Sequence, residues 1–135
     1  MEESIKIEEA IAKALKLEAV DPRTYSPLVL AYIGDAVYEL LIRTKVINHG
    51  SMQVNKMHKK SASLVKAETQ ANIIKAIQDD LTEEELAVYK RGRNAKSATT
   101  AKHATMMDYR MATGFEALVG YLYLQAQHDR LLELI

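Results

Sequence analysis

The stretch Leu30–Leu40, LAYIGDAVYEL, decides the fold of this chain. Its apolar residues cover most of the circumference of a helix that we predict from Pro27 to about Val46. Ser26 supplies a capping hydroxyl at the start of this helix, and a proline at the first helical position loses no hydrogen bond. A helix that is apolar nearly all round belongs in the interior of a globular protein.

Two carboxylates lie on helix faces that should be buried. Asp35 lies within the apolar set of the first stretch, and Gly34 beside it removes a side chain that would otherwise shield the carboxylate. Glu116 lies in the middle of the apolar stripe of the last predicted helix. A buried carboxylate loses much of its hydration energy unless it is paired or bound to a metal. Salt bridges to Arg43 or Arg110 are one explanation, and the other is Mg²⁺, which prefers oxygen ligands and usually takes one or two carboxylates.

Helical periodicity runs through the rest of the chain, and no segment alternates with the period of a half-buried strand. We therefore predict an all-α fold, a single compact domain of about six or seven helices. An acidic N-terminal helix and linker, residues 1–25, precede the main domain, residues 26–135. The expected helices run from Glu3 to Leu17, from Pro27 to about Val46, from Met52 to Gln78 as a short and a long helix with a break near His58, from the Thr82–Glu85 capping box to Gly92, and from Tyr109 to about Gln127 behind the cap Asp108.

The composition is that of a folded globular protein. Hydrophobic residues make up 48% of the 135 residues, with only five Gly and two Pro, which argues against disordered and fibrous classes. The chain lacks a long apolar run and a basic start followed by an apolar block, so we expect neither a membrane span nor a secretory signal. The absence of cysteine excludes a disulfide framework and fits a reducing compartment. We expect a cytoplasmic protein without a membrane partner.

Charge is segregated along the chain although the formal net charge is zero. Residues 43–75 hold seven basic side chains and one acidic, residues 76–88 hold five acidic and no basic, and residues 89–103 hold five basic and no acidic. The segment from Gly92 to Thr105 lacks periodicity, and we interpret it as an exposed basic loop. Such a basic pole suits a polyanion, although a solvated surface is the other explanation of a charge run.

Two motifs of the chain resemble those of a known family. LAYIGDAVYEL is similar to the signature helix of ribonuclease III, and FEALVGYLYL (Phe115–Leu124) resembles the second acidic helix of that family, in the same order and about eighty residues away. Between them, HKKSASLV (His58–Val65) and YKRGRNAKS (Tyr89–Ser97) resemble the Mini-ribonuclease III branch, whose members carry the catalytic domain alone. The likeness covers roughly residues 26–127 and implies a ribonuclease III-like helical domain.

The resemblance implies a divalent-metal site. Asp35 and Glu116 match the metal-binding aspartate and glutamate of the family, so they are the expected catalytic residues and the ligands of Mg²⁺, for which Mn²⁺ can substitute. The metal would activate a water for attack on a phosphodiester and neutralise the charge that develops. Ala31 and Thr113 stand where the broader family has two further acids, and the Mini-ribonuclease III branch resembles the chain in these absences. We therefore expect one Mg²⁺ per site. The four histidines lack the spacing of a metal site.

The resemblance also implies an endoribonuclease of double-stranded RNA that trims precursor large-subunit ribosomal RNA, with a ribosomal protein shaping the substrate. Proteins grip A-form RNA mainly through phosphates and 2′-hydroxyls, which suits basic side chains on a loop. The two strands of a duplex match a C2 homodimer. We expect its interface on the signature helix at Leu30, Tyr32, Ile33 and Val37, although core packing would explain these residues too. The expected RNA contacts are Lys59, Lys60, Lys90, Arg91, Arg93, Asn94, Lys96, Ser97 and Lys102.

Two other functions fit the sequence. A catalytically silent ribonuclease III-like module that binds duplex RNA without cutting it would explain Ala31 and Thr113. A helical interaction protein with no nucleic-acid role would explain the basic segment as solvation. Magnesium-dependent cleavage of a long RNA duplex separates the enzyme from both.

Overall fold

The computed structural model of the chain describes residues 7–48, 53–95 and 105–135, and within these ranges all regular secondary structure is helical, with no strand. This confirms the all-α prediction. Two short 3₁₀ helices, η1 (Pro22–Thr24) and η2 (Gln78–Asp80), accompany the α-helices. The α-helices are α1 (Ile7–Leu15), α2 (Pro27–Asn48), α3 (Val54–Val65), α4 (Ala67–Ile77), α5 (Glu83–Asn94), α6 (Met106–Leu124) and α7 (His128–Leu134).

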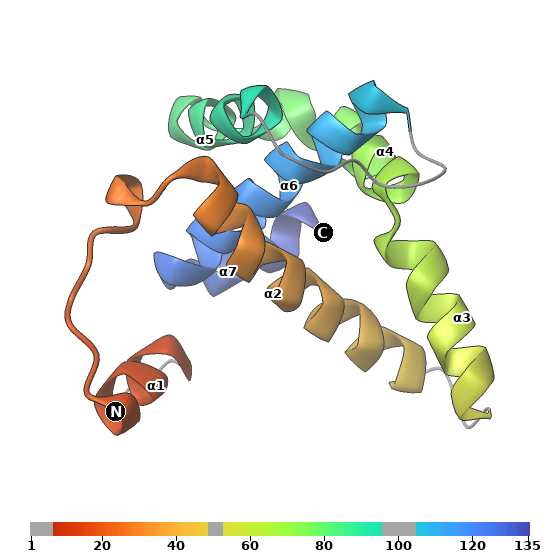
Figure 1. Cartoon of the computed structure of the whole chain (residues 1–135), viewed down its shortest axis with the longest axis horizontal. Coiled ribbons are helices and arrows are strands. Elements are labelled where there is room, and N and C mark those ends of the chain that lie inside the picture. The colour runs from red at the N-terminus through yellow and green to blue at the C-terminus, as the bar shows by residue number, and fades with distance from the viewer. Residues whose placement is uncertain (1–6, 49–52, 96–104) are drawn as a thin grey trace.

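Helix α6 is the central element of the fold. It is buried along most of its length, and α2, α4 and α5 pack against it (Figure 1). The Tyr38 ring of α2 meets the Phe115 ring of α6 edge-on, with the ring centroids 5.3 Å apart. The apolar stripes of these four helices therefore form one core, as their periodicity predicted.

Two helix starts confirm the capping signals in the sequence. At the start of α2, Ser26 Oγ accepts a hydrogen bond from the Val29 N–H at 3.3 Å. At the start of α5, Thr82 Oγ1 accepts from the Glu85 N–H at 3.1 Å, while Glu85 Oε1 accepts from the Thr82 N–H at 2.9 Å. The second pair is a complete capping box.

Other boundaries differ from the prediction. Thr105 caps α6, since its Oγ1 accepts from the Asp108 N–H at 3.0 Å, so Asp108 lies inside the first turn. The helix ends at Leu124 rather than Gln127, because Ala126 has a φ of 58° and α7 follows as a separate helix. The break between α3 and α4 falls at Lys66, which is extended, and not near His58.

Helix α5 does not end at Gly92, as the sequence suggested, but continues to Asn94, and most of the predicted basic loop lies outside the described residues. Gly92 is buried against α6, where a Cβ would lie 2.8 Å from the Ala117 Cβ and 2.9 Å from the Gly114 Cα. The glycine therefore serves close helix packing, and it does not end the helix.

A partly buried ion pair holds α7 to α5. Arg130 Nη2 lies 2.7 Å from Glu85 Oε1, and Arg130 Nε donates to Glu85 Oε2 at 2.8 Å. Arg130 Nη2 also donates to the Asp80 carbonyl at 2.6 Å. The hydrogen bonds from Arg130 hold the pKa of Glu85, a residue only 4% exposed, below its ordinary value. Glu85 thus caps its own helix and anchors the C-terminal one.

Helix α1 is the least buried part of the described chain, with no buried residue, and an extended segment separates it from α2 (Figure 1). It ends at Leu15 rather than at Leu17, and Lys16 follows with a φ of 55°. Asp21 caps η1. Glu8 of α1 reaches α7, where its Oε1 lies 2.8 Å from Nε2 of His128. The division into residues 1–25 and 26–135 stays a prediction.

The outer face of α2 exposes only part of the predicted dimer interface. Leu30 was a wrong choice for this interface, because it is 1% exposed and belongs to the core. Tyr32 is 83% exposed, whereas Ile33 and Val37 are half-buried.

Among the helices in the described ranges, none combines the length and apolar character needed to cross a lipid bilayer.

Candidate metal centre and RNA-binding surface

Helices α2 and α6 cross with their backbones in contact, and two glycines make this contact feasible. A Cβ on Gly34 would lie 1.7 Å from the Glu116 carbonyl oxygen, and one on Gly120 would lie 2.0 Å from the Leu30 carbonyl oxygen. Because Asp35 follows Gly34 directly, the crossing brings Asp35 next to Glu116. The role of Gly34 is therefore to admit the backbone of α6, which differs from the expected role of leaving Asp35 unshielded.

The two carboxylates lie in different surroundings. Asp35 is exposed to solvent, whereas Glu116 is half-buried. The pKa of Glu116 is raised to about 8, mainly by burial and further by a hydrogen bond to Asp35 and by the charge of Asp35. At pH 7 such a carboxyl group keeps its proton, so the pair carries less than two negative charges. A bound cation would reverse this balance, because its positive charge favours both ionised forms.

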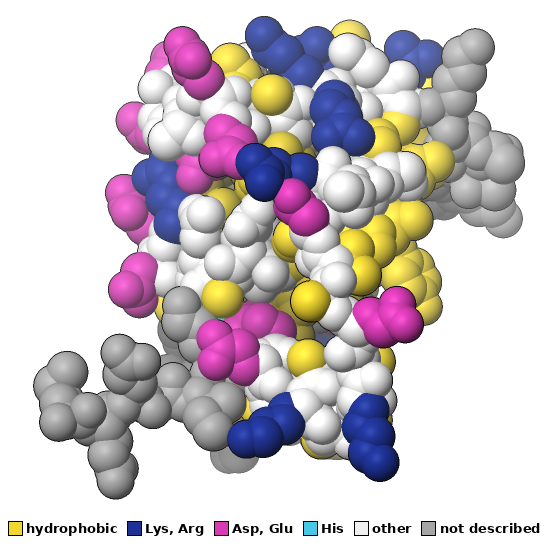
Figure 2. All heavy atoms as spheres, turned by 90° about the vertical axis from the view of Figure 1, so that its left-hand side faces the viewer, with side chains coloured by type: hydrophobic (Ala, Val, Ile, Leu, Met, Phe, Trp, Pro, Cys, Tyr) yellow, Lys and Arg dark blue, Asp and Glu magenta, His cyan; other side chains and the backbone are white. Residues whose placement is uncertain are grey.

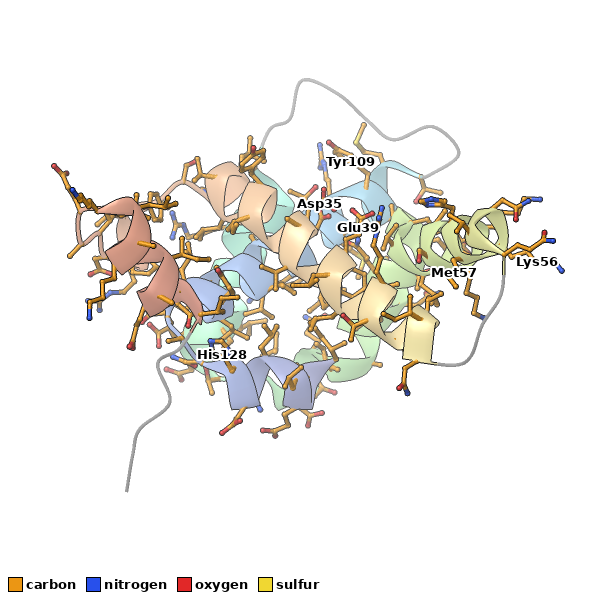
Figure 3. All side chains as sticks on the ribbon, turned by 90° about the horizontal axis from the view of Figure 1, so that it is seen from below. Asp35, Glu39, Lys56, Met57, Tyr109 and His128 are labelled. Atoms are coloured by element: carbon orange, nitrogen blue, oxygen red, sulfur yellow. The ribbon has the colours of Figure 1, made fainter. Side chains whose placement is uncertain are left out.

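The salt-bridge explanation of these carboxylates finds no support in the described part of the chain. Arg43 pairs with Glu39, with Arg43 Nη2 and Glu39 Oε1 2.6 Å apart. Glu39 lies one helical turn from Asp35 along α2 (Figure 3). Arg110 is exposed at the start of α6. No ion pair within the described ranges joins Asp35 or Glu116 to a basic side chain.

Ala31 and Thr113, which replace two acids of the broader ribonuclease III pattern, are both buried. The Thr113 hydroxyl donates to the Tyr109 carbonyl of its own helix at 3.0 Å. Within the residues that the structure describes, no three His, Cys, Asp or Glu side chains lie close enough to hold one metal. The site therefore offers two carboxylates, which is the number that magnesium sites commonly use.

Gln70 of α4 is a polar residue of this site that the sequence analysis missed. It is 2% exposed, and its side chain hydrogen-bonds Glu116, which lowers the pKa of that carboxyl and partly offsets the effect of burial. The signal that could have found it is the one that identified Asp35, a polar residue in an apolar stripe, here the stripe of Ala67, Ala71 and Ile74.

The basic end of α5 lies beside the turn of α6 that carries Glu116, because Gly92 packs against Gly114 and Ala117 on both sides of it. Lys90, Arg91 and Asn94 are exposed there, and the Arg93 guanidinium lies 5.7 Å from the centre of the Tyr89 ring. On the face seen in Figure 2, Lys and Arg side chains gather at the top, the side on which α5 lies in Figure 1. Lys59 and Lys60 are exposed on α3. Lys96, Ser97 and Lys102 lie outside the described residues.

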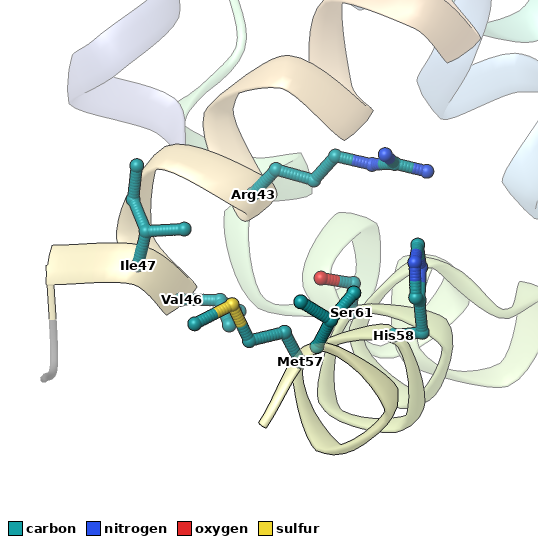
Figure 4. A pocket seen from close by; sticks show the side chains of 7 residues that line it. Arg43, Val46, Ile47, Met57, His58 and Ser61 are labelled. Carbon is teal, nitrogen blue, oxygen red and sulfur yellow. The ribbon is translucent and has the colours of Figure 1, made fainter. Parts of the chain in front are cut away.

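Two hollows elsewhere on the described surface lack the carboxylate pair. One, of about 120 Å³, lies between α2 and α3, with Arg43 and His58 on one side of it and Met57 and Ile47 on the other (Figure 4). The other, of about 360 Å³, lies between α1, α2 and α7 and has mainly apolar walls. Neither hollow is lined by Asp35 or Glu116, so the crossing of α2 and α6 stands as the candidate centre.

Comparisons with known proteins point to one family. The Ribonuclease III domain matches residues 28–127, a range that contains both carboxylates and both crossing glycines. A Mini-ribonuclease 3 from Clostridium tetani is 55% identical, covering 85% of this chain and 77% of its own length. One from Brevibacillus brevis is 48% identical, covering 85% and 86%. A crystal structure of a Fusobacterium nucleatum protein covers 86% of this chain and 93% of its own, with a TM-score of 0.78 and 35% identity.

Proposed function

Since this chain belongs to the ribonuclease III family, in its Mini-ribonuclease III branch, we propose that it cuts double-stranded RNA with one divalent cation held between Asp35 and Glu116. Membership of the family makes the chain an endoribonuclease. The observation that carries the proposed site is the convergence of two carboxylates from separate helices at a glycine crossing.

The groups at the crossing fit Mg²⁺. The carboxylates of Asp35 and Glu116 supply the hard oxygen atoms that this ion prefers. When bound, Mg²⁺ would supply the Lewis acidity that activates water and stabilises charge on the phosphate. Glu116 would hold it from the protein side and give up its proton on binding, and exposed Asp35 would hold it from the side of the substrate. Mn²⁺ would serve in place of Mg²⁺.

The basic residues near this centre would position the RNA. Lys90 and Arg91 project from the end of α5 next to the Glu116 turn, and stacking on Tyr89 gives Arg93 a defined position. Such fixed charges suit the phosphates of a duplex, which carry no sequence information. We propose that Asn94, Lys59 and Lys60 contribute further contacts, as do Lys96, Ser97 and Lys102, which lie outside the described residues.

We propose that the enzyme works as a homodimer, with one centre for each strand of the duplex. The outer face of α2 supports this proposal, because Val29, Tyr32 and Leu40 are 46%, 83% and 62% exposed along one helical stripe. An apolar stripe of this kind on a helix marks a protein interface.

The natural substrate we propose is precursor large-subunit ribosomal RNA, processed in the cytoplasm with a ribosomal protein that shapes it. Support comes from the match to the Mini-ribonuclease III branch and from a sequence without cysteine. Comparing the ribosomal RNA ends of cells with and without the gene tests this proposal, and unchanged ends would contradict it.

Cleavage of a long RNA duplex by the purified chain tests the activity and the site. We expect cutting with Mg²⁺ and none with a chelator, and we expect Asp35→Asn and Glu116→Gln to abolish cutting while RNA affinity stays nearly unchanged. Glu39→Gln is the matched control, because it alters a carboxylate one turn along α2 that is already paired with Arg43. Cutting by both site variants would remove the assignment.

Ala31 and Thr113 favour a second candidate, a module that grips duplex RNA without hydrolysing it, because two acids of the broader family are absent. Such a module would bind the duplex with the same affinity with and without Mg²⁺ and would leave it intact. The cleavage experiment therefore separates the two functions.

A further inference from the structure

Gln70 joins the Glu116 carboxylate to the start of α4. The side chain lies in the first turn of α4 and is 2% exposed. Its Nε2 donates to the Val65 carbonyl, at the end of α3, at 2.8 Å. The same side chain lies close enough to Glu116 on α6 to lower the pKa of that carboxyl. One amide therefore ties the candidate centre to the junction of α3 and α4.

The Val65 carbonyl fixes the orientation of the Gln70 amide. A carbonyl oxygen accepts hydrogen bonds and cannot donate them, so the NH₂ group must face it. Nε2 carries a second hydrogen, which is available to the Glu116 carboxylate. Oε1 is bonded to the same carbon as Nε2, so it lies within one amide group of that carboxylate. It is buried and has no hydrogen-bond partner among the described residues.

A buried acceptor without a donor destabilises a fold, so this oxygen calls for a partner that the described residues do not supply. Mg²⁺ usually keeps several waters when proteins bind it, and each of these waters is a hydrogen-bond donor. We propose that Gln70 is a positioning residue of the metal centre. Its N–H orients the Glu116 carboxylate, and its Oε1 accepts a hydrogen bond from a water of the hydrated cation. This inference rests on the proposed function, because it needs a cation at Asp35 and Glu116.

Titration of Mn²⁺ alone into the purified chain, followed by calorimetry without RNA, tests the inference. Wild type should bind Mn²⁺, and Asp35→Asn should abolish the binding. Gln70→Met removes both polar atoms and keeps a long unbranched side chain, so it should weaken Mn²⁺ binding about 10-fold, the lower end of the effect for groups that orient metal ligands. Gln70→Leu serves as a second variant where the methionine variant does not fold.

Tyr38→Phe is the matched control for stability. The Tyr38 hydroxyl donates to the Leu64 carbonyl at 2.9 Å, so this variant removes a buried hydrogen bond to the same junction, one residue from Val65. It leaves Gln70 and both carboxylates intact. We expect Tyr38→Phe to lose stability and to bind Mn²⁺ with wild-type affinity.

The outcomes distinguish this inference from the proposed function. Weaker binding in both Gln70 variants, with Tyr38→Phe unchanged, supports the positioning role. Wild-type affinity in the Gln70 variants, or an equal loss in Tyr38→Phe, overturns that role and leaves the carboxylate site in place. Failure of wild type to bind Mn²⁺, or full binding by Asp35→Asn, overturns the site itself and the inference with it.

Discussion

Gly34→Ala should lower both the stability of the protein and its rate of RNA cleavage, because it acts on the contact between α2 and α6. The new Cβ would lie 1.7 Å from the Glu116 carbonyl oxygen and 2.8 Å from the Gly120 nitrogen. Both neighbours are backbone atoms of α6, so no side-chain rotation relieves the overlap. A tolerable contact of about 3 Å then requires the two helices to separate by more than about 1 Å.

The expected magnitude follows from this separation. Overpacking a core typically costs about 1–3 kcal/mol, and alanine regains up to about 1 kcal/mol over glycine as a better helix former. Because the clash lies at the centre of the α2–α6 interface, we expect a cost at the upper end of this range and a net loss of about 2 kcal/mol in the free energy of unfolding. Moving Asp35 about 1 Å relative to Glu116 should also reduce the cleavage rate about 100-fold.

Urea denaturation followed by circular dichroism measures the first effect, and single-turnover cleavage of an RNA duplex by folded protein measures the second. Tyr38→Phe is the control, since it should lose about 1 kcal/mol and keep the wild-type rate. Cleavage at the wild-type rate by a folded Gly34→Ala variant would refute the view that this crossing sets the spacing of the carboxylates.

Other predictions concern charge. In the metal-free protein, the pKa of Glu116 is raised from near 4.5 to about 8, so between these pH values the folded state binds more protons than the unfolded state. The free energy of unfolding should therefore fall as the pH rises from 4.5 to 8, by up to about 1.4 kcal/mol per pH unit. Glu116→Gln should flatten this fall in urea titrations with a chelator. Arg130→Met should cost about 3 kcal/mol in the same titrations, because it leaves Glu85 buried without its partner. Arg91→Ala should reduce the slope of log K against log salt for duplex RNA by nearly one unit, and an unchanged slope would remove this contact. Tyr32→Glu should convert the proposed homodimer to a monomer in light-scattering measurements, and a persistent dimer would contradict the proposed interface on α2.

The features that could be predicted from the sequence are local ones. The apolar pattern around Leu30–Leu40 defines α2, and the Thr82–Glu85 pair defines the start of α5, because both depend on residues within a turn or two. The start of α6 was predicted wrongly because two local capping signals compete there. Thr105 and Asp108 are both good capping residues three positions apart, and their local sequence does not decide between them.

The features that could not be predicted depend on which helix faces which. Gly34 and Gly120 are far apart in sequence, and only their contact in space explains why neither can carry a side chain. Gly92 was interpreted as a helix end because its packing partner on α6 was unknown. Gln70 was passed over for the same reason, since a glutamine in α4 gains a role only through Glu116 on another helix.

The two substituted acids explain why backbone geometry matters so much at this centre. Ala31 and Thr113 are buried at positions where the broader family pattern has carboxylates. With those extra carboxylates, a site could still hold a metal ion after one of its ligands had shifted. With two carboxylates on different helices, the distance between α2 and α6 alone determines whether both reach one cation. A change at the glycine crossing should therefore reduce cleavage more than the loss of any one basic side chain on α5, because several such contacts share the binding of the duplex.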